Sequence, residues 1–434
     1  MASDLPPSLR LYRGLSQVAT PFASPYINNR VKRGKEDAAR VGERKGQSNV
    51  ARPAGPLVWI HGASVGEILA VGALVERLRA MNIGILLTSG TVTSAAMVAQ
   101  RFPPDVIHQF IPLDSPRFVA RFLDHWQPSF ALFVESDLWP NLILAGSERR
   151  IPMIVANGRM SQRSFQKWRM LPGMMRTLMS RFEMCLAQSQ GDADRFAALG
   201  SPHVFNTGKL QVDVPAPPAD PDKLEQLRIA VQGRPVVVAA STHPSEEEHV
   251  FEALKRLKHY FPSLLLLVAP RHPDRGGSIA QLAGNFGLQG ALRSRGELPM
   301  ASNDVYIADT LGELGLLYRL TPIVFMGGSF VTMGGHNPVE AVKLGAATIH
   351  GPNVENWSEI YEALGAAGGA RLAENGEALV KHIGGWLDDR NAQQRASAAA
   401  RTVVDRLGGA LDKTMAALEP YLLQLRLESG SAHA

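Results

Sequence analysis

Short apolar runs alternate with amphipathic stretches along most of this 434-residue chain. The runs have the length of buried strands, and glycine or polar residues follow each of them directly. The stretches between them repeat apolar positions with the period of a helix, as in ILAVGALVERLRAM after Glu67. Strands alternating with helices predict a doubly wound α/β fold with parallel sheets. The predicted strands are residues 56–60, 83–88, 106–110, 130–134 and 152–156, then 236–240, 264–269, 305–308, 322–326 and 347–350.

The alternation is interrupted by the proline-rich segment VPAPPADPD, which follows the strand-like HVFNTG. Such a segment between two similar halves is typical of an interdomain linker. We therefore expect two Rossmann-like domains facing an interdomain cleft. The expected parts are a basic amphipathic arm (1–50), an N-terminal domain (51–214), a linker (215–222) and a C-terminal domain that includes the last helices (223–434).

The arm carries much of the positive charge of a chain with a net charge of +5 and a pI near 9.3. Apolar residues such as Leu11, Leu15 and Phe22 lie among its first arginines. Two interpretations are open: a solvated, partly disordered arm, or a weak interfacial helix on an anionic membrane. Nucleic acid is a less suitable partner, because aromatic and basic residues do not interleave here as they do in stacking surfaces.

Several classes of protein are disfavoured by what the sequence lacks. No apolar window approaches the roughly 18 residues of a membrane-spanning helix, and the N-terminus lacks the order of a signal peptide. The single cysteine, Cys185, lies in an apolar segment and is expected to be a buried, inert thiol in a reducing compartment. No HxxxH spacing or cysteine partner is present, so no metal site is expected. A GxSxG elbow and a Walker loop are also missing.

The stretch FMGGSFVTMGGHNPVE, residues 325–340, combines a strand end, two glycine pairs and a helix start. Glycines let a backbone approach an anionic ligand, and helix starts offer free N–H groups. Asn337 suits the N-cap, Pro338 the first helical position and Glu340 the third, which would make a capping box. The alternative is that Glu340 holds the ribose of a nucleotide. On local sequence alone both interpretations stand.

Polar clusters follow most of the predicted strands, where open α/β sheets bind ligands. Glu67, Glu313 and Glu340 each occupy a predicted third helical position behind a Ser, Thr or Asn cap. A capping glutamate beside a cleft can still act as a general base if it reaches the proton that it removes. Glu67 is our candidate base. Arg271 and Arg275 suit phosphate or carboxylate recognition, with a surface ion pair to Asp274 as the alternative.

Taken together, these motifs resemble the 3-deoxy-D-manno-octulosonic acid (Kdo) transferases of lipopolysaccharide assembly. The matching runs are WIHGASVGE (59–67), TSGTVTSA (88–95), ESDLWPNLI (135–143), ANGRMSQRS (156–164), STHPSEE (241–247), PRHPDR (270–275), DTLGELGLLY (309–318) and GGSFVTMGGHNPVEA (327–341). They span nearly the whole chain. The resemblance implies a GT-B fold, CMP-Kdo as donor, a lipid A precursor as acceptor, and no cofactor or metal.

The resemblance also assigns roles to individual residues. Glu67 of the SVGE run would accept the proton, and Glu135 of the ESDLWPN run would support the transition state. The residues that would contact CMP are Arg271, His272, Leu311, Gly312, Glu313, Asn337, Pro338, Val339 and Glu340. The protein would then lie peripherally on the cytoplasmic face of the inner membrane.

This chain departs from the family pattern at two positions. Where the family reads G-x-L-K-F-D, this chain has GKLQVD, so the expected transition-state lysine is Gln211. Lys209 precedes it by two residues, which in a strand is the same face, so that Lys209 is a candidate substitute. Asp137 replaces the second glutamate of the family's ExELWPN run.

The expected function is inverting transfer of Kdo from CMP-Kdo to lipid IV(A). Two alternatives remain at this level. One is a GT-B enzyme that uses a UDP-sugar on the same architecture. The other is a non-catalytic CMP- or lipid-binding paralogue, which the loss of the lysine at Gln211 makes conceivable. The number of Kdo residues transferred, the acyl-chain requirement and the oligomeric state are not encoded in these motifs.

Overall fold

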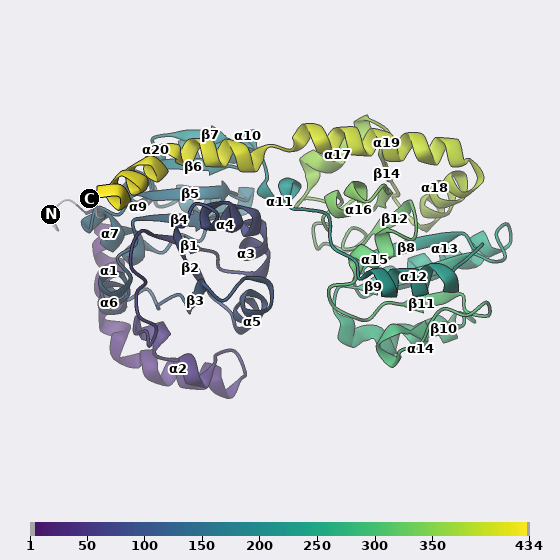
Figure 1. Ribbon diagram of the computed structural model, residues 1–434, viewed down its shortest axis with the longest axis horizontal. Coiled ribbons are helices and arrows are strands. Elements are labelled where there is room, and N and C mark those ends of the chain that lie inside the picture. The colour runs from purple at the N-terminus through teal and green to yellow at the C-terminus, as the bar shows by residue number, and fades with distance from the viewer. Residues whose placement is uncertain (1–4, 432–434) are drawn as a thin grey trace. The chain divides into compact units, whose positions relative to one another are not determined.

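The computed structural model describes residues 5–431, with side chains up to residue 427. The chain divides into two compact units (Figure 1). The first unit comprises the chain up to Val214 together with the residues from Gly408 onwards, and the second comprises Pro215–Leu407. Each unit is a parallel α/β sheet with helices on its faces, as the sequence pattern predicts.

The first unit is built on a seven-stranded sheet of order β3-β2-β1-β4-β5-β6-β7. All its paired strands are parallel, with Trp59 of β1 opposite Leu86 of β2 and Ala131 of β4. The order reverses beside β1, which makes the carboxyl ends of β1 and β4 the expected place for a ligand. The strands are β1 (Leu57–His61), β2 (Gly84–Ser89), β3 (Val106–Phe110), β4 (Phe130–Val134), β5 (Met153–Gly158), β6 (Met184–Ala187) and β7 (Val204–Asn206).

Two apolar layers cover the faces of this sheet. Leu57 and Trp59 of β1 pack into one layer, and the alternate residues Val58 and Ile60 pack into the other. Cys185 lies in the first layer, where burial raises the pKa of its thiol, as expected for an inert cysteine. The α-helices of the unit are α1 (Pro7–Ala19), α2 (Ala23–Lys32), α3 (Val65–Ala70), α4 (Gly72–Arg79), α5 (Val92–Arg101), α6 (Pro116–Trp126), α7 (Pro140–Glu148), α8 (Gln162–Arg169), α9 (Pro172–Met179), α10 (Gln190–Ala198), α11 (Leu210–Asp213) and α20 (Ala410–Ser431).

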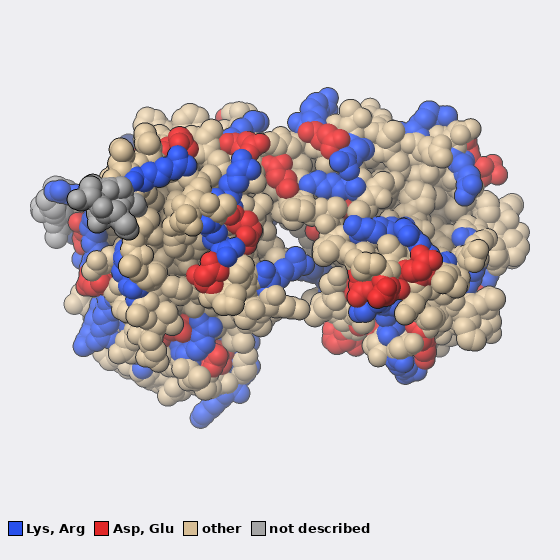
Figure 2. Space-filling view, in the orientation of Figure 1, with Lys and Arg blue, Asp and Glu red and all other residues tan. Residues whose placement is uncertain are grey.

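The second unit repeats the architecture with a sheet of order β10-β11-β9-β8-β12-β13-β14. Its strands are β8 (Val236–Thr242), β9 (Leu265–Pro270), β10 (Gly290–Leu292), β11 (Val305–Ile307), β12 (Ile323–Met326), β13 (Ala347–His350) and β14 (Ala370–Leu372). Its α-helices are α12 (Pro221–Ala230), α13 (Glu246–Lys258), α14 (Gly276–Asn285), α15 (Leu314–Tyr318), α16 (Val339–Lys343), α17 (Ser358–Ala366), α18 (Gly376–Asp388) and α19 (Arg390–Leu407). Acidic and basic side chains are interspersed on the surfaces in view (Figure 2).

The C-terminal boundary differs from the sequence-based expectation. The last helix, α20, belongs to the first unit, where it packs on α4 and α11 (Figure 1). Leu418 and Leu422 are fully buried in the first unit's core, and Asp213 accepts hydrogen bonds from the N–H groups of Gly409 and Leu411. Helical periodicity predicts a buried face but not the partner that buries it, which is why the sequence assigned this helix to the nearer domain.

The basic arm is also part of the first unit rather than a separate, partly disordered segment. Helix α1 packs on α6, α7 and α9. The hydroxyl of Tyr12 donates to Asp114 at 3.0 Å, and Asn141 donates to Ser16 at 2.8 Å. Among the described residues no helix is both long and apolar enough to cross a membrane.

Candidate functional site

Four charged side chains and their partners gather at the carboxyl ends of β1, β4 and β7 in the first unit. We define the glutamate cluster as Glu67 after β1, Glu135 after β4 and Lys209 after β7, with Asp137 beside His61. Parallel strands bring these loops to one edge of the sheet, although the residues lie far apart in sequence. The cluster thus unites two of the predicted catalytic residues.

Ser64 caps the start of α3 with Glu67 at the third helical position, as the sequence predicts, but the Glu67 carboxylate binds the N–H of Ala63 rather than that of the cap residue. Ser64 accepts from the N–H of Glu67 at 3.4 Å. In return, the Glu67 carboxylate accepts from the N–H of Ala63 at 2.7 Å and from the Ser64 hydroxyl at 2.9 Å. Burial is the largest cause that raises the pKa of Glu67 above its ordinary value, which favours proton uptake.

Glu135 follows β4 with a φ of 61°, a left-handed conformation that is uncommon for a residue with a side chain. Burial and then the charge of Glu67 raise the pKa of Glu135, while Arg159, Lys209 and a hydrogen bond from Gln188 oppose this rise. Two carboxylates with raised pKa values and nearby cations form an arrangement that can accept a proton and stabilise positive charge.

Asp137 is held by a chain of hydrogen bonds that the sequence did not reveal. His61 Nε2 lies 2.9 Å from Asp137 Oδ2, and His61 Nδ1 lies 2.9 Å from the Thr88 hydroxyl. The Trp139 indole donates to the same Asp137 oxygen at 3.0 Å. Burial opposes ionisation of Asp137, but these hydrogen bonds outweigh it and lower the pKa of the carboxyl. Asp137, one methylene shorter than the glutamate of the family pattern, is therefore an ionised carboxylate held in place by these hydrogen bonds.

Gln211 is placed differently from our strand-based expectation. Leu210–Asp213 form the short helix α11, so Lys209 and Gln211 do not share one face of a strand. The Gln211 side-chain oxygen accepts from Asn157 Nδ2 at 3.2 Å, while the charge of Lys209 acts on Glu135. Lys209 is therefore a cation at this edge, together with Arg159, although the periodicity argument that suggested Lys209 was wrong.

In the second unit a buried carboxylate organises the glycine loop after β12. Glu246, at the start of α13, is fully buried and accepts four backbone N–H groups at 2.6–3.0 Å. The donors are His243, Gly328, Ser329 and Phe330. These loop amides are therefore engaged inside the protein.

The glycines of this loop are required by close approach and by backbone conformation. A Cβ on Gly327 would lie 2.5 Å from the carbonyl oxygen of Ser241. Gly328 has a φ of 67°, and the His336 ring lies against it. These contacts bring the end of β8 and the loop together, so that His243 and His336 meet.

Three histidines and an arginine line the same edge of the second sheet. The rings of His243 and His336 stack with an interplanar angle of 3°, and their Nε2 atoms lie 2.9 Å apart. One ring must donate and the other accept, so the two rings cannot both be protonated. Burial is the largest cause that lowers the pKa of each, which favours the neutral pair. Burial first, and then Arg271, lowers the pKa of His336 to about 4. His272 approaches His243 edge-on, with ring centroids 6.0 Å apart.

The two arginines of the PRHPDR run have different roles. Arg275 forms a bidentate ion pair with Glu247, which also accepts from the Thr242 hydroxyl at 2.7 Å. Arg275 is therefore structural, and its partner is the buried Glu247 rather than Asp274. Arg271 and His272 are exposed, so these two predicted ligand residues can meet an anion.

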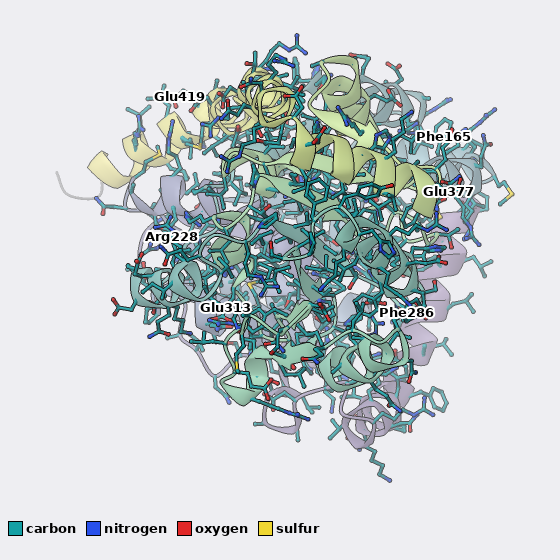
Figure 3. The ribbon with its side chains drawn as sticks, turned by 90° about the vertical axis from the view of Figure 1, so that its right-hand side faces the viewer. Phe165, Arg228, Phe286, Glu313, Glu377 and Glu419 are labelled. Carbon is teal, nitrogen blue, oxygen red and sulfur yellow. The ribbon has the colours of Figure 1, made fainter. Side chains whose placement is uncertain are left out.

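The DTLGE run lies beside this region with an arrangement that the sequence did not predict. Glu313 (Figure 3) is the N-cap residue of the five-residue helix α15 and not its third residue. The Arg293 side chain is the largest cause that lowers the pKa of Glu313 to about 2, with Thr310 and Lys223 adding to it. Leu311 is 83 % exposed and Gly312 has a φ of 78°, which leaves the backbone of this turn open.

The last predicted ligand run, Asn337 to Glu340, is shifted by one position relative to the expected cap. Pro338 is the N-cap of α16, and the Asn337 side chain accepts from the N–H of Val339 at 2.9 Å. Glu340 is therefore the second helical residue. Pro338 and Val339 are buried, whereas Asn337 and Glu340 are half-buried.

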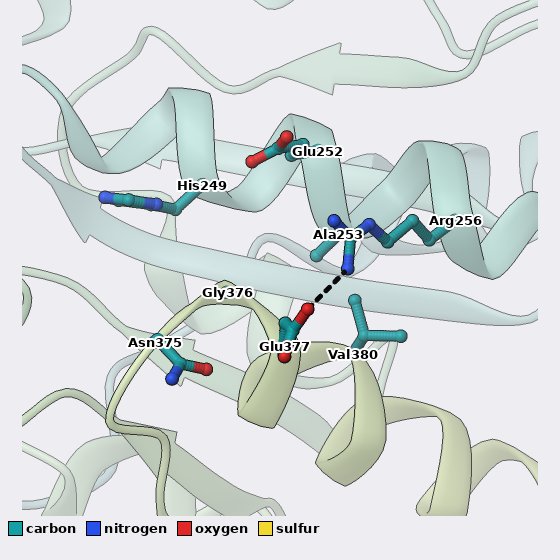
Figure 4. A pocket seen from close by; sticks show the side chains of 8 residues that line it. All are labelled: His249, Glu252, Ala253, Arg256, Asn375, Gly376, Glu377 and Val380. Carbon is teal, nitrogen blue, oxygen red and sulfur yellow. Dashed lines mark ion pairs between the residues drawn. The ribbon is translucent and has the colours of Figure 1, made fainter.

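A separate cavity of about 330 Å³ lies between α13 and α18 (Figure 4). An ion pair between Arg256 and Glu377 crosses it at 3.6 Å. None of the predicted site residues lines this cavity. Among residues 5–431 no group of three or more His, Cys, Asp or Glu side chains is placed to hold a metal ion.

The buried carboxylate gives a testable prediction. We expect Glu246→Gln to lower the free energy of unfolding by about 3 kcal/mol, because the amide leaves at least one buried N–H without an acceptor. Hydrogen exchange at Gly328–Phe330 should accelerate in the same variant. The matched control is Glu248→Gln, an exposed residue two positions along the same helix, which should stay within about 0.5 kcal/mol. Unchanged exchange at the loop in Glu246→Gln would contradict the role of this carboxylate.

Solved structures share the fold of this chain. A glycosyltransferase from Rickettsia africae matches with a TM-score of 0.59 and 16% identity over 85% of this chain and 99% of the other. A UDP-GlcNAc 2-epimerase from Neisseria meningitidis gives the same TM-score with 13% identity, over 85% and 100%. At these identities the likeness shows the fold alone, and it confirms the GT-B type expected from the sequence.

Sequence comparison identifies the family. Residues 39–214 match the family described as 3-Deoxy-D-manno-octulosonic-acid transferase (kdotransferase). The 3-deoxy-D-manno-octulosonic acid transferase of Haemophilus influenzae is 32% identical over 95% of this chain and 98% of its own length. A probable mitochondrial 3-deoxy-D-manno-octulosonic acid transferase of Arabidopsis thaliana is 35% identical over 82% of both chains. The chain therefore belongs to the 3-deoxy-D-manno-octulosonic acid transferase family and is a glycosyltransferase.

Proposed function

We propose that this protein transfers Kdo from CMP-Kdo to a lipid A precursor, lipid IV(A), in lipopolysaccharide biosynthesis. The observation that carries the proposal is the glutamate cluster. It places a carboxylate with a raised pKa, Glu67, beside a second carboxylate and a lysine at the ligand-binding edge of a Rossmann-like sheet. Membership of the Kdo transferase family supports the choice of sugar.

In the proposed reaction Glu67 is the general base. Its carboxylate removes the proton from an acceptor hydroxyl, whose oxygen forms the new bond to the anomeric carbon of Kdo. The bond between that carbon and the CMP phosphate, which lies on the opposite side of the carbon, breaks, and its electron pair leaves with CMP. Glu135 stabilises the positive charge that develops on the sugar. The proton and the leaving group are thereby accounted for by Glu67 and CMP, and we propose no metal in this reaction.

We propose that the predicted residues of the second unit bind the nucleotide. Arg271 and His272 are exposed and suit a phosphate, with the neutral His243–His336 pair behind them. Asn337 and Glu340 supply amide and carboxylate groups for the ribose or base, and the open turn at Leu311 and Gly312 supplies backbone. Because Glu313 is already paired with Arg293 and Lys223, we assign it to holding this turn.

We further propose that the protein binds peripherally to the cytoplasmic face of the inner membrane through α1. Four residues spaced along the end of α1 and the following turn form what we call the apolar stripe: Leu11, Leu15, Val18 and Phe22, each more than 60% exposed. Their spacing places them on one side of the helix. The arginines and lysines near the end of α2 add attraction to anionic lipid.

The membrane proposal has a direct measurement. We expect Leu15→Glu to reduce co-sedimentation with vesicles of phosphatidylethanolamine and phosphatidylglycerol by about ten-fold, because a charge replaces a buried apolar contact of roughly 1.5–3 kcal/mol. Gln17→Glu, an exposed neighbour outside the stripe, adds the same charge and is the control. Equal loss in both variants would show that charge alone, and not the stripe, governs binding.

The proposed base is tested by transfer to lipid IV(A), followed by mass spectrometry. Wild-type protein with CMP-Kdo should give a product heavier by one or more Kdo units, whereas Glu67→Gln should lose at least about 100-fold in kcat, as expected when a general base is removed. CMP binding should be unchanged, and UDP should not compete. Near-normal transfer by Glu67→Gln would remove Glu67 from this role.

The rate of the wild type should fall with decreasing pH through a pKa above the ordinary glutamate value, because burial raises the pKa of Glu67 and the base must be ionised.

The cation beside Glu135 gives a further prediction. We propose that Lys209 takes the part that the family pattern gives to a lysine at the position of Gln211. We expect Lys209→Met to reduce kcat by about 100-fold, since a preorganised charge beside the reacting centre is lost. Gln211→Met should reduce kcat by less than about ten-fold, because Gln211 is bonded to Asn157 and acts through it. The reverse order of effects would assign the role to Gln211.

A further inference from the structure

An apolar groove of about 380 Å³ lies beside the apolar stripe in the first unit. One wall comes from α1, the turn after it and α2. The other comes from the segment between β3 and α6, from the first turn of α6 and from Trp139, the N-cap residue of α7. The lining residues that carry the argument are Ala19, Phe22, Tyr26, Leu113, Phe118 and Trp139. All six present mainly carbon to the groove, so its preferred occupant is apolar.

The polar groups along the groove are already satisfied within the protein. The Tyr12 hydroxyl donates to Asp114, which also accepts the N–H groups of Asn141 and Leu142 at 3.0 and 2.9 Å. The hydroxyls of Thr20 and Ser115 bond to each other at 2.6 Å. Because these side chains have their partners, a ligand in the groove gains little from hydrogen bonding and most from burial of carbon.

Two of the lining residues connect the groove to other parts of the first unit. Phe22 belongs both to the groove and to the apolar stripe that we propose to contact the membrane. Trp139, on the opposite wall, donates its indole N–H to Asp137, the partner of His61 in the glutamate cluster. The groove therefore shares Phe22 with the proposed membrane contact, and its lining residue Trp139 is one hydrogen bond from the candidate catalytic cluster.

We propose that this groove binds an acyl chain of the lipid acceptor and so positions the acceptor sugar for transfer. The proposal rests on the proposed function, since it takes the acceptor to be an acylated disaccharide. An unbranched alkyl chain matches a groove lined by carbon with no free polar group, and each buried methylene contributes about 0.8 kcal/mol. Two or more buried methylenes would then account for at least a ten-fold preference for the acylated acceptor.

The test fills the groove and compares two acceptors in detergent micelles, so that membrane attachment is not measured. Ala19→Trp places a large side chain on an exposed wall position, where folding should be unaffected. We expect this variant to raise KM for the tetraacylated acceptor by about ten-fold and to leave transfer to the deacylated disaccharide bisphosphate and CMP affinity unchanged. The matched control is Gln17→Trp, which adds the same side chain at an exposed position outside both the groove and the apolar stripe and should leave both KM values within about two-fold.

A second measurement detects an acyl chain in the groove by photolabelling, without relying on turnover. The tetraacylated acceptor carrying a diazirine in one acyl chain should label peptides containing Tyr26 or Phe118 in the wild type, and Ala19→Trp should remove that labelling. Labelling of these peptides supports binding of an acyl chain in the groove, even if no transfer occurs. Labelling without transfer would contradict only the proposed function. An unchanged KM in Ala19→Trp, labelling confined to other peptides, or a dimer in solution that Ala19→Trp dissociates would each overturn the proposal.

Discussion

The second unit depends on the burial of one carboxylate. Glu246 is fully buried and accepts N–H groups from the end of β8 and from three successive residues after β12. A charged acceptor is stronger than a neutral one, and four donors offset the cost of removing it from water. The loop thereby acquires one fixed shape and turns its amides inward. The side chains of Arg271 and His272 remain exposed.

The first unit builds its site by a related constraint, in which strand-end residues accept strained backbone conformations. Glu135 and Asn157 both have left-handed φ values, at 61° and 51°, which cost about 1–2 kcal/mol each for residues with a side chain. Hydrogen bonds hold Asn157 there: its side chain binds Leu210 and Gln211, and its carbonyl accepts from Gln188. Both residues lie at the carboxyl ends of β4 and β5, the edge of the sheet at which the glutamate cluster lies.

Much of the fold could be predicted, because buried parallel strands are continuous apolar runs. Residues 106–110, 130–134 and 347–350 are strands with the predicted bounds, and most others agree within two residues. The short strands β6, β10 and β14 were not predicted, although β11, β12 and β13, which are equally short, were. Caps were less predictable: Ser64 caps as expected, whereas Glu313 is drawn into an ion pair with Arg293, a residue twenty positions earlier.

The sequence by itself determined the α/β class, the family and the positions of the candidate residues, because strand periodicity and motif order are local properties of the chain. It did not determine which helix covers which sheet, so α20 was assigned to the wrong unit. Nor did it show that Glu246 and Glu247 are buried anchors, since an acidic helix start looks the same whether it faces water or backbone amides. Only the tertiary structure decided these points, because burial and hydrogen-bond partners come from segments that are distant in sequence.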